Sequence, residues 1–558
     1  MSDTTTQLTG AGIGQGLALG RVLRMSDPLP EPADEASTRT PDEEKARVTA
    51  AVAAVGADLR ARAAKVTGVA SDVLEAQSMM AEDSTLADDV ASRIDGGKTA
   101  ERAVYEGFAV FRDMLIGLGG YMGERATDLD DVAQRVIAAL EGRPAPGVPE
   151  SDEPYILVAR DLAPADTALL DLSKVLGLVT REGGPTSHTA ILAREKAIVA
   201  IVGVAGADGL ADGTEVIVDA AAGTVTVSPT PEQRADAERR IEDRKAALSG
   251  GLEPGVLADG TSIPLLANLG SAEGADAALA AGAEGVGLFR TEFLFLDARM
   301  APTVEQQRDQ YAKLLQAFPG KKVVVRVLDA GADKPLEFLN DAHEDNPALG
   351  LRGLRALRAN EDILREQLTA LAEADARTDA DLWVMAPMVA TVEETRYFVR
   401  LASEFGLKTV GVMVEVPSAA LLADRVLEEA AFASIGTNDL TQYTLAADRL
   451  LGSVAGFQDP WHPAVLRLIG DVGAAGAAKG KPVGICGEAA ADPLLAVVLV
   501  GLGATTLSMS PAAIADVRLS LTRYTLDQAR VLAEAALAAD GAAEARDAVR
   551  AAAARFTP

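Results

Sequence analysis

The pattern of hydrophobic and polar residues changes character along the chain. Residues 1–25 hold short apolar pairs separated by glycines, which predicts weak strands joined by turns. Between about residues 40 and 140, apolar residues recur at three- and four-residue spacing, which predicts a bundle of long helices. The predicted helices cover residues 42–65, 71–94, 99–118 and 128–140.

Shorter elements follow a proline-rich linker at residues 143–149, where the prolines prevent a helix from continuing. Brief apolar runs alternate there with one helical pattern, which predicts a small α/β domain. The strand-like runs are residues 155–159, 174–179, 198–202, 215–219 and 223–227, and the helical one is 189–196. Residues 230–249 are charged and rich in alanine at helical spacing, so we expect an exposed helical linker.

Beyond residue 252 the chain alternates regularly between strand-like and helical segments. Eight strand-like runs in about 300 residues are typical of a (β/α)₈ barrel. The runs are residues 263–269, 285–288, 323–328, 382–387, 409–415, 432–435, 483–485 and 506–509.

A chain of 558 residues exceeds what one hydrophobic core usually organises, so several domains are expected. We predict a multidomain α/β protein with a small swivelling α/β domain, an inserted N-terminal helical bundle and a C-terminal (β/α)₈ TIM barrel. The predicted bounds are 1–24 with 144–229 for the α/β domain, 25–143 for the bundle, 230–252 for a helical linker and 253–558 for the barrel. We expect the α/β domain to swing on residues 144–154 and 228–252.

The net charge of −30 argues against binding to nucleic acid or an anionic membrane, because phosphates would be repelled. It is compatible with a basic protein partner, although an acidic surface that only aids solubility is the simpler explanation. The single cysteine excludes an internal disulfide, and no apolar run is long enough to span a bilayer. Together with the absence of a signal-peptide pattern, this predicts a cytoplasmic protein.

Polar residues recur where the predicted barrel strands end. The set is Arg290-Thr291-Glu292, Arg326 with Asp329, Glu415, Asn438-Asp439 and Cys486. A barrel carries its working residues at the C-terminal ends of its strands, and core packing would favour apolar residues at these positions. The sequence therefore predicts an active site at this end of the barrel.

The residue types indicate the ligands of that site. Arg290 and Arg326 offer planar charged groups suited to a phosphate ester that also carries a carboxylate, and Arg352 and Arg449 could join them. Two further residues, Glu415 and Asp439, supply the oxygen ligands that Mg²⁺ requires, although ordinary ion pairing would explain each carboxylate taken singly.

Cys486 also follows a predicted strand. Its thiol could give a proton to a carbon atom or take one from it. A buried, inert cysteine is an equally good explanation of this residue.

The chain has three histidines, so elimination is informative. His343 lies in a run of charged residues, where a solvated side chain is expected. His462 precedes a proline in a turn, which favours a structural role. His188 is left as the candidate nucleophile.

The residues around His188 support this choice. A Gly-Gly turn and a Thr-Ser pair precede it, and a helical pattern follows, so His188 is expected at a helix N-terminus. Backbone N–H groups and the helix dipole stabilise an anion there, such as a phosphoryl group on the imidazole. Arg194 could add a bidentate contact to that phosphoryl group.

Four motifs resemble enzyme I of the bacterial phosphoenolpyruvate:sugar phosphotransferase system, and the resemblance covers essentially the whole chain. The motifs are GGPTSHTAI at 183–191, GVGLFRTEFLF at 285–295, VEVP at 414–417 and SIGTNDLTQY at 434–443. The sequence departs from the family pattern at Pro185, where many members carry arginine, and at Ala332, where glycine is common.

The resemblance implies a role for each candidate residue. His188 would accept the phosphoryl group of phosphoenolpyruvate, with support from Thr167 and Arg194. The substrate would be bound by Arg290, Arg326, Arg449 and Asn438, and Mg²⁺ by Glu415 and Asp439. Cys486 would protonate the enolate to give pyruvate.

The resemblance also implies partners. The helical bundle would dock the histidine phosphocarrier protein HPr, with residues 75–83 as an acidic docking helix, and the barrel would form a homodimer. Two alternatives share this architecture. A pyruvate phosphate dikinase or phosphoenolpyruvate synthase would need an ATP-binding domain, and no glycine-rich phosphate loop is present to suggest one. A regulatory paralogue often carries an extra sensory domain, which residues 1–25 are too short to form.

Overall fold

The computed structural model describes residues 6–556 except 15, 27–28, 65–68, 119, 144–146, 150, 163–169, 185–186, 196–197, 221, 249–252, 296–300, 331–335, 337–343, 345 and 450–451. The chain divides into two compact units, which are described separately below. One comprises Met1–Ala193 and Ile198–Ile241, and the other comprises Arg194–Ala197 and Glu242–Pro558.

The first unit contains a sheet that joins the N-terminal strands to the predicted α/β region. Its strand order is β1-β8-β7-β3-β4-β5-β6-β2. The strands β3, β4, β5 and β6 run parallel to their neighbours in this set, with Val22 opposite Ile156 in the β3–β4 pair. The strands are β1 Thr6–Thr9, β2 Ala11–Ile13, β3 Leu17–Arg24, β4 Tyr155–Ala159, β5 Val175–Thr180, β6 Val199–Val202, β7 Glu215–Asp219 and β8 Thr224–Val227.

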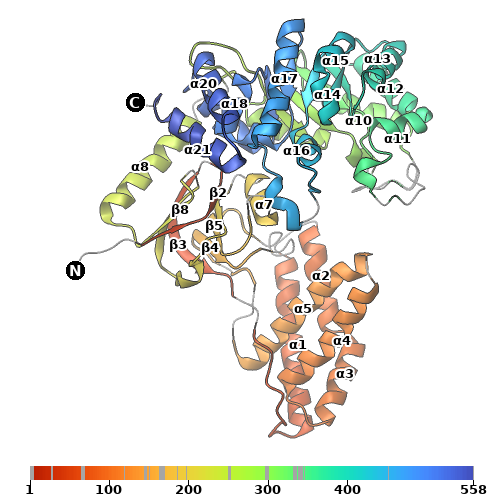
Figure 1. The fold of residues 1–558 in the computed structure, drawn as a ribbon. Coiled ribbons are helices and arrows are strands. Elements are labelled where there is room, and N and C mark those ends of the chain that lie inside the picture. Colours follow the sequence, from red (N-terminus) through yellow and green to blue (C-terminus); the bar gives the residue numbers. More distant parts are fainter. Residues whose placement is uncertain are drawn as a thin grey trace. The chain divides into compact units, whose positions relative to one another are not determined.

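A helical bundle connects β3 to β4 in the chain (Figure 1). It consists of α1 Pro41–Ala63, α2 Val69–Ala81, α3 Ser84–Asp95, α4 Ala100–Leu118 and α5 Gly120–Glu141. The bundle packs around fully buried aliphatic side chains such as Leu59, Val104 and Val132. The predicted bundle is therefore present.

Two predicted helix bounds in the bundle are wrong. The single helix expected at 71–94 is interrupted, because the Asp83 carboxylate accepts hydrogen bonds from the N–H groups of Thr85 (2.8 Å) and Leu86 (3.2 Å) and so begins a new helix. The helix α5 begins at Gly120 rather than near residue 128, although glycine weakens helices.

The second unit contains a closed barrel with the strand order β10-β11-β12-β13-β14-β15-β16-β9, and every pair is parallel. This confirms the predicted TIM-barrel fold and all eight predicted strands. The strands are β9 Leu265–Leu269, β10 Val286–Arg290, β11 Lys322–Arg326, β12 Asp381–Ala386, β13 Thr409–Val414, β14 Ala433–Ile435, β15 Val483–Ile485 and β16 Thr506–Met509.

Helices alternate with these strands and cover the barrel. The longer ones are α9 Ala275–Ala280, α10 Val304–Gln316, α11 Leu354–Ala359, α12 Glu361–Asp375, α13 Val392–Glu404, α14 Pro417–Leu421, α15 Ala423–Glu429, α16 Thr437–Leu445, α17 Pro463–Lys479, α18 Pro493–Gly501, α19 Ile514–Leu521, α20 Leu526–Leu537 and α21 Ala542–Ala553. The charged helix α8, Pro231–Leu248, precedes the barrel and confirms the helical pattern predicted at 230–249.

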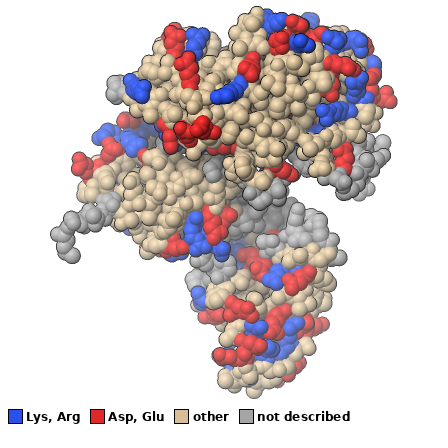
Figure 2. Space-filling view, in the orientation of Figure 1, with Lys and Arg blue, Asp and Glu red and all other residues tan. Residues whose placement is uncertain are grey.

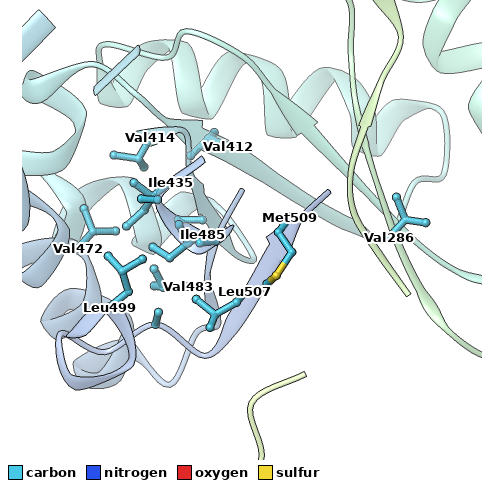
Figure 3. Packing of buried hydrophobic residues seen from close by; sticks show 14 of the residues in the cluster. Val286, Val412, Val414, Ile435, Val472, Val483, Ile485, Leu499, Leu507 and Met509 are labelled. Atoms are coloured by element: carbon cyan, nitrogen blue, oxygen red, sulfur yellow. The ribbon is translucent and has the colours of Figure 1, made fainter. Parts of the chain in front are cut away.

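Successive side chains of a barrel strand face opposite sides. In β11, Val323 and Val325 belong to the large core between strands and helices, whereas Val324 belongs to a small cluster in the lumen with Met385 and Met413. Figure 3 shows Ile435, Ile485 and Leu507, from three consecutive strands, in the large core. This alternation determines which polar residues enter the lumen.

Acidic and basic side chains lie next to one another on the face of the helical bundle seen in Figure 2. Examples are Arg93 with Glu106 (3.0 Å) and Arg102 with Glu31 (2.6 Å). Within the described ranges, no helix is both long and apolar enough to cross a membrane.

Candidate active site

The predicted site residues of the barrel lie at the C-terminal ends of its strands. Arg290 and Arg326 are the last residues of β10 and β11, Glu415 directly follows β13, and Cys486 directly follows β15. Asp439 lies in the first turn of α16. Because parallel strands end at the same mouth of the barrel, the structure brings these residues together.

Arg326 is buried and surrounded by carboxylates. Its guanidinium contacts Glu292 and lies 3.2 Å from the Asp329 carboxylate. Burial opposes the charge of Arg326, but the carboxylates of Glu292, Asp329 and Glu415 outweigh this effect and raise its pKa above the ordinary value. Arg326 therefore remains a cation in the free protein.

Arg352 connects this group to Asp439. Its guanidinium donates a 2.8 Å hydrogen bond to Asp439, lies 3.5 Å from Asp329 and donates to the Tyr443 hydroxyl at 3.2 Å. Arg449 donates to the other oxygen of Asp439 at 3.2 Å. One carboxylate thus holds two of the arginines that were predicted to bind substrate.

Glu415 is 1% exposed and accepts a 2.7 Å hydrogen bond from the N–H of Met388. Met388 adopts a φ of +55°, a backbone conformation that side-chain-bearing residues rarely adopt. Burial raises the pKa of Glu415 to about 8, with further contributions from the neighbouring Asp439 and Asp329 carboxylates. The negative charge of Glu415 is therefore disfavoured in the free protein by burial and by the neighbouring carboxylates.

Two carboxylate oxygens in this group lack a hydrogen-bond partner. Oδ1 of Asp329 and Oε2 of Glu292 are buried without a hydrogen-bond partner, and burial also raises the pKa of Asp329. Hard oxygen donors of this kind fit Mg²⁺. The part of the chain that the structure describes contains no group of three or more His, Cys, Asp or Glu arranged to hold a metal.

Cys486 is 3% exposed and anchored to the neighbouring strand. Its N–H donates to the Ile435 carbonyl at 3.0 Å, and its thiol donates to the same oxygen at 3.5 Å. Burial raises the pKa of Cys486 to about 11, so the thiol is protonated at neutral pH. A Cβ at Gly487 would lie 1.8 Å from Oγ1 of Thr437, so only glycine allows this close approach of the two loops.

Asn438 lies beside this loop. Its side-chain amide donates to Glu488 at 3.5 Å, and its amide oxygen accepts the N–H of Glu488 at 3.1 Å. These contacts fix Asn438 to the loop that carries Cys486. Asn438 is therefore part of the same mouth as the arginines.

His188 begins the helix α7, His188–Glu195, as predicted. Gly183 has a φ of +94°, and Ser187 accepts a hydrogen bond from the N–H of Ala190 at 3.3 Å, which caps the first turn. Thr189 is fully buried and donates to Asp161 at 3.0 Å. The backbone setting predicted for His188 is therefore present.

Some predictions concern parts of the protein that the structure does not describe. Thr167, Pro185, Ala332 and His343 lie outside the described residues. The side chains of His188 and Arg194 also lie outside them.

His462 confirms the structural role predicted for it. It is the N-cap of α17, and its Nδ1 accepts a hydrogen bond from the N–H of Ala464 at 3.2 Å. This bond satisfies an N–H group that the first helical turn would otherwise leave unpaired.

Comparison with protein families identifies three matches along the chain, all to PEP-utilising enzymes. Residues 9–125 match their N-terminal domain, residues 151–223 their mobile domain, and residues 248–526 their PEP-binding domain.

Whole-chain relatives agree with these matches. A phosphoenolpyruvate-protein phosphotransferase of Streptomyces coelicolor is 53% identical over 98% of this chain and 99% of its own length. Proteins of the same name from Haloferax volcanii (41% identical, 85% of each chain) and Geobacillus stearothermophilus (37% identical, 96% of each chain) are also similar. Together with the barrel, the mobile-domain sheet and the helical bundle, these relationships show that the chain belongs to the phosphoenolpyruvate–protein phosphotransferase family, enzyme I of the sugar phosphotransferase system.

Proposed function

We propose that this protein transfers the phosphoryl group of phosphoenolpyruvate to His188 and then to a histidine of HPr. The observation that carries the proposal is the buried group of arginines and carboxylates at the barrel mouth. Four of its members, Arg326, Arg352, Glu415 and Asp439, are 8% exposed or less. Buried charges at this density are characteristic of sites that bind a charged ligand.

Phosphoenolpyruvate carries a phosphate and a carboxylate, which match the planar guanidinium groups of Arg290, Arg326, Arg352 and Arg449. In the free protein, Arg326, Arg352 and Arg449 are paired with carboxylates. Substrate binding would therefore exchange internal ion pairs for pairs with the ligand. Asn438, held beside the mouth by Glu488, would add an amide contact to the phosphate.

Mg²⁺ would be held by Glu415 and Asp439. The raised pKa of Glu415, which follows from burial and from its acidic neighbours, indicates a place where a cation would be stabilised. When bound, Mg²⁺ supplies charge neutralisation for the phosphate oxygens. Engagement of Asp439 with the cation would also free Arg352 and Arg449 for the substrate.

Cys486 would donate its proton to the enolate carbon as the phosphoryl group leaves. The thiol is protonated in the free protein, and the electrostatic effects of Arg290, Arg326 and Glu415 on it indicate that it faces the same mouth. His188 would attack the phosphorus. The N-terminus of α7 would stabilise the phosphohistidine through its backbone N–H groups and the helix dipole, and Thr167 and Arg194 would add side-chain support.

The helical bundle would dock HPr through the segment 75–83. In α2, Met79 is 70% exposed and Glu75 is also exposed, whereas Gln77 and Ser78 face the bundle core. An exposed methionine beside a carboxylate offers an adaptable apolar contact and an attraction for a basic partner. The domain that carries His188 would then move between the barrel and HPr. The segments 144–154 and 228–252 would act as its hinges.

A homodimer through the barrel would cover exposed apolar side chains. Leu349, Leu421 and Phe457 are 67%, 66% and 60% exposed, respectively. Exposed apolar residues of this size often mark protein interfaces. Sedimentation velocity of the wild type and of a Leu421→Glu variant would test this, because only the variant should sediment as a monomer.

Labelling with ³²P-phosphoenolpyruvate and Mg²⁺ tests the central proposal. We expect one acid-labile, base-stable phosphoryl group on the protein, and the group should pass to HPr when HPr is added. Labelling that depends on ATP instead, or label that HPr cannot remove, would overturn the proposal.

A further inference from the structure

The lumen of the barrel below Cys486 contains polar groups that the proposed reaction does not use. In β11, Lys322 and Arg326 share the inward face with Val324, because side chains alternate along a strand. Arg326 lies at the active-site mouth, and Lys322 lies four residues away at the opposite end of the lumen. A lysine on the inward face of a barrel is unusual, because burial disfavours its charge.

A small cavity adjoins Lys322. Its polar lining consists of the lysine and the hydroxyl-bearing residues Ser434, Thr506 and Ser508, and Gly484 and Gly287 leave room for it. Its volume is about 10 Å³, which is close to the space that one buried water needs. Several hydroxyl groups and an amine offer that water the two to four partners it requires.

Lys322 is suited to exchange a proton near neutral pH. Its Nζ lies 3.7 Å from the centroid of the Trp383 ring and 5.7 Å from that of Phe432, and its side chain is partly exposed at the N-terminal end of the strand. Burial lowers the pKa of Lys322 to about 8, and the nearby Asp381 carboxylate opposes this shift. Either protonation state is therefore accessible.

The cavity also contacts the residues that hold Cys486. Ser434 lines it, and its hydroxyl lowers the pKa of the Cys486 thiol, which burial raises. Ser508 donates to Asn268 at 2.5 Å, and Asn268 donates to the carbonyl of Cys486 at 3.0 Å. Polar side chains therefore lie between the residues around Cys486 and the Lys322 end of the lumen.

We propose that this lumen returns a proton from Lys322 to Cys486 after each turnover, through one water in the cavity and the Ser434 hydroxyl. The inference rests on the proposed role of Cys486 as proton donor. A thiol that has given its proton to the enolate carbon is left as a buried thiolate, which burial strongly disfavours. Substrate at the mouth hinders access of bulk water from that side.

Each step of this return conserves protons. The thiolate takes the proton of the Ser434 hydroxyl, the hydroxyl takes one from the water, and the water takes one from the Lys322 ammonium. The neutral amine then takes a proton from bulk solvent at the N-terminal end of the barrel. Each turnover consumes one solvent proton and leaves all four groups unchanged.

Rapid mixing of the full-length protein with phosphoenolpyruvate and Mg²⁺ tests the relay. Cys486 is the one cysteine of the sequence, so the ultraviolet absorbance of a thiolate reports on it alone. In Lys322→Met, we expect phosphorylation of the protein in the first turnover, followed by thiolate decay at least about tenfold slower than in the wild type. Ser434→Ala should likewise be phosphorylated in the first turnover and then show slow thiolate decay.

Lys321→Met is the matched control, since Lys321 precedes β11 and does not line the cavity. It should behave as the wild type in both measurements. Equal thiolate decay in Lys322→Met and the wild type, or no thiolate signal in either, would overturn the relay. A purely structural role of Lys322 would instead slow phosphorylation and decay together. Absence of phosphorylation in the wild type would overturn the proposed function itself.

Discussion

Nη1 of Arg352 donates to Oδ1 of Asp439 at 2.8 Å, and both residues are 5% exposed. Asp439 also accepts a hydrogen bond from Arg449 at 3.2 Å. In the free protein this carboxylate therefore holds two cations away from the position that substrate would take.

Asp439→Asn should lower the rate of phosphorylation by phosphoenolpyruvate on the order of 100-fold, because an amide neither neutralises Mg²⁺ nor holds the arginines equally. The rate should also lose most of its dependence on Mg²⁺ concentration. Asp459→Asn is a matched control, since Asp459 pairs with Arg546 at 3.0 Å elsewhere in the barrel unit. If Asp439→Asn kept the Mg²⁺ dependence of the wild type, Asp439 would not be a metal ligand.

His188→Ala should abolish labelling, whereas His462→Ala should retain it. His462→Ala should nevertheless lower the free energy of unfolding by about 1 kcal/mol, because it removes an N-cap hydrogen bond. Quantitative labelling and urea unfolding of both variants would separate chemistry from stability. Persistent labelling of His188→Ala would show that another residue is the nucleophile.

The raised pKa of Glu415 predicts that the stability of the metal-free protein depends on pH. Its pKa is raised from 4.5 to about 8, so the folded protein binds a proton that the unfolded chain releases between these values. The free energy of unfolding should therefore contain a contribution that is present at low pH and lost as the pH rises toward 8. Glu415→Gln should remove this contribution. Mg²⁺ should restore stability at pH 8 in the wild type, and an equal effect in Glu415→Gln would contradict the assignment.

Met79→Asp should raise the KM for HPr by about tenfold and leave labelling by phosphoenolpyruvate unchanged, because a charge at the centre of an apolar contact is poorly accommodated. Glu305→Lys, on the exposed start of α10, is a control for charge changes and should affect neither rate. Unaltered transfer to HPr in Met79→Asp would place the docking surface elsewhere.

Lys322→Met should stabilise the protein at pH 7 by about 1–3 kcal/mol, because it removes a charge that burial disfavours. The pKa of Lys322 is lowered from 10.5 to about 8, so between these values the unfolded chain binds a proton that the folded protein lacks. Wild-type stability should therefore rise relative to the variant over this range. Chemical unfolding at pH 7 and pH 10 would measure the difference, and a constant difference would be inconsistent with a buried Lys322.

The sequence predicted the barrel well because its strands are short runs of buried aliphatic residues bounded by glycine, proline or charged residues. The parallel arrangement then places Arg290, Arg326, Glu415 and Cys486 at one mouth, so the position of the site followed from topology. The ion pairs within the site could not be predicted from topology. Glu292 and Asp329 were visible as polar residues after strands, but nothing local shows that they pair with arginines distant in the chain.

Local patterns also failed where tertiary packing decides the outcome. The apolar periodicity of 71–94 continues across the break that Asp83 makes, and α5 extends through glycines that disfavour a helix. Lys322 stands at the start of a strand, where a lysine normally reaches solvent. Only the closed barrel reveals that its amine lies against the rings of Trp383 and Phe432.

The connection between β3 and β4 has a consequence for how this protein diversifies. These two strands are parallel neighbours in one sheet, with Val22 opposite Ile156, and all five helices of the bundle lie on the segment that joins them. Parallel neighbours require a crossover connection, and here the bundle lies within it. Substitutions that adapt the proposed docking surface to a changing partner can therefore accumulate in the bundle while the sheet that carries α7 is preserved. Selection can therefore act separately on the proposed docking surface and on the proposed phosphohistidine site.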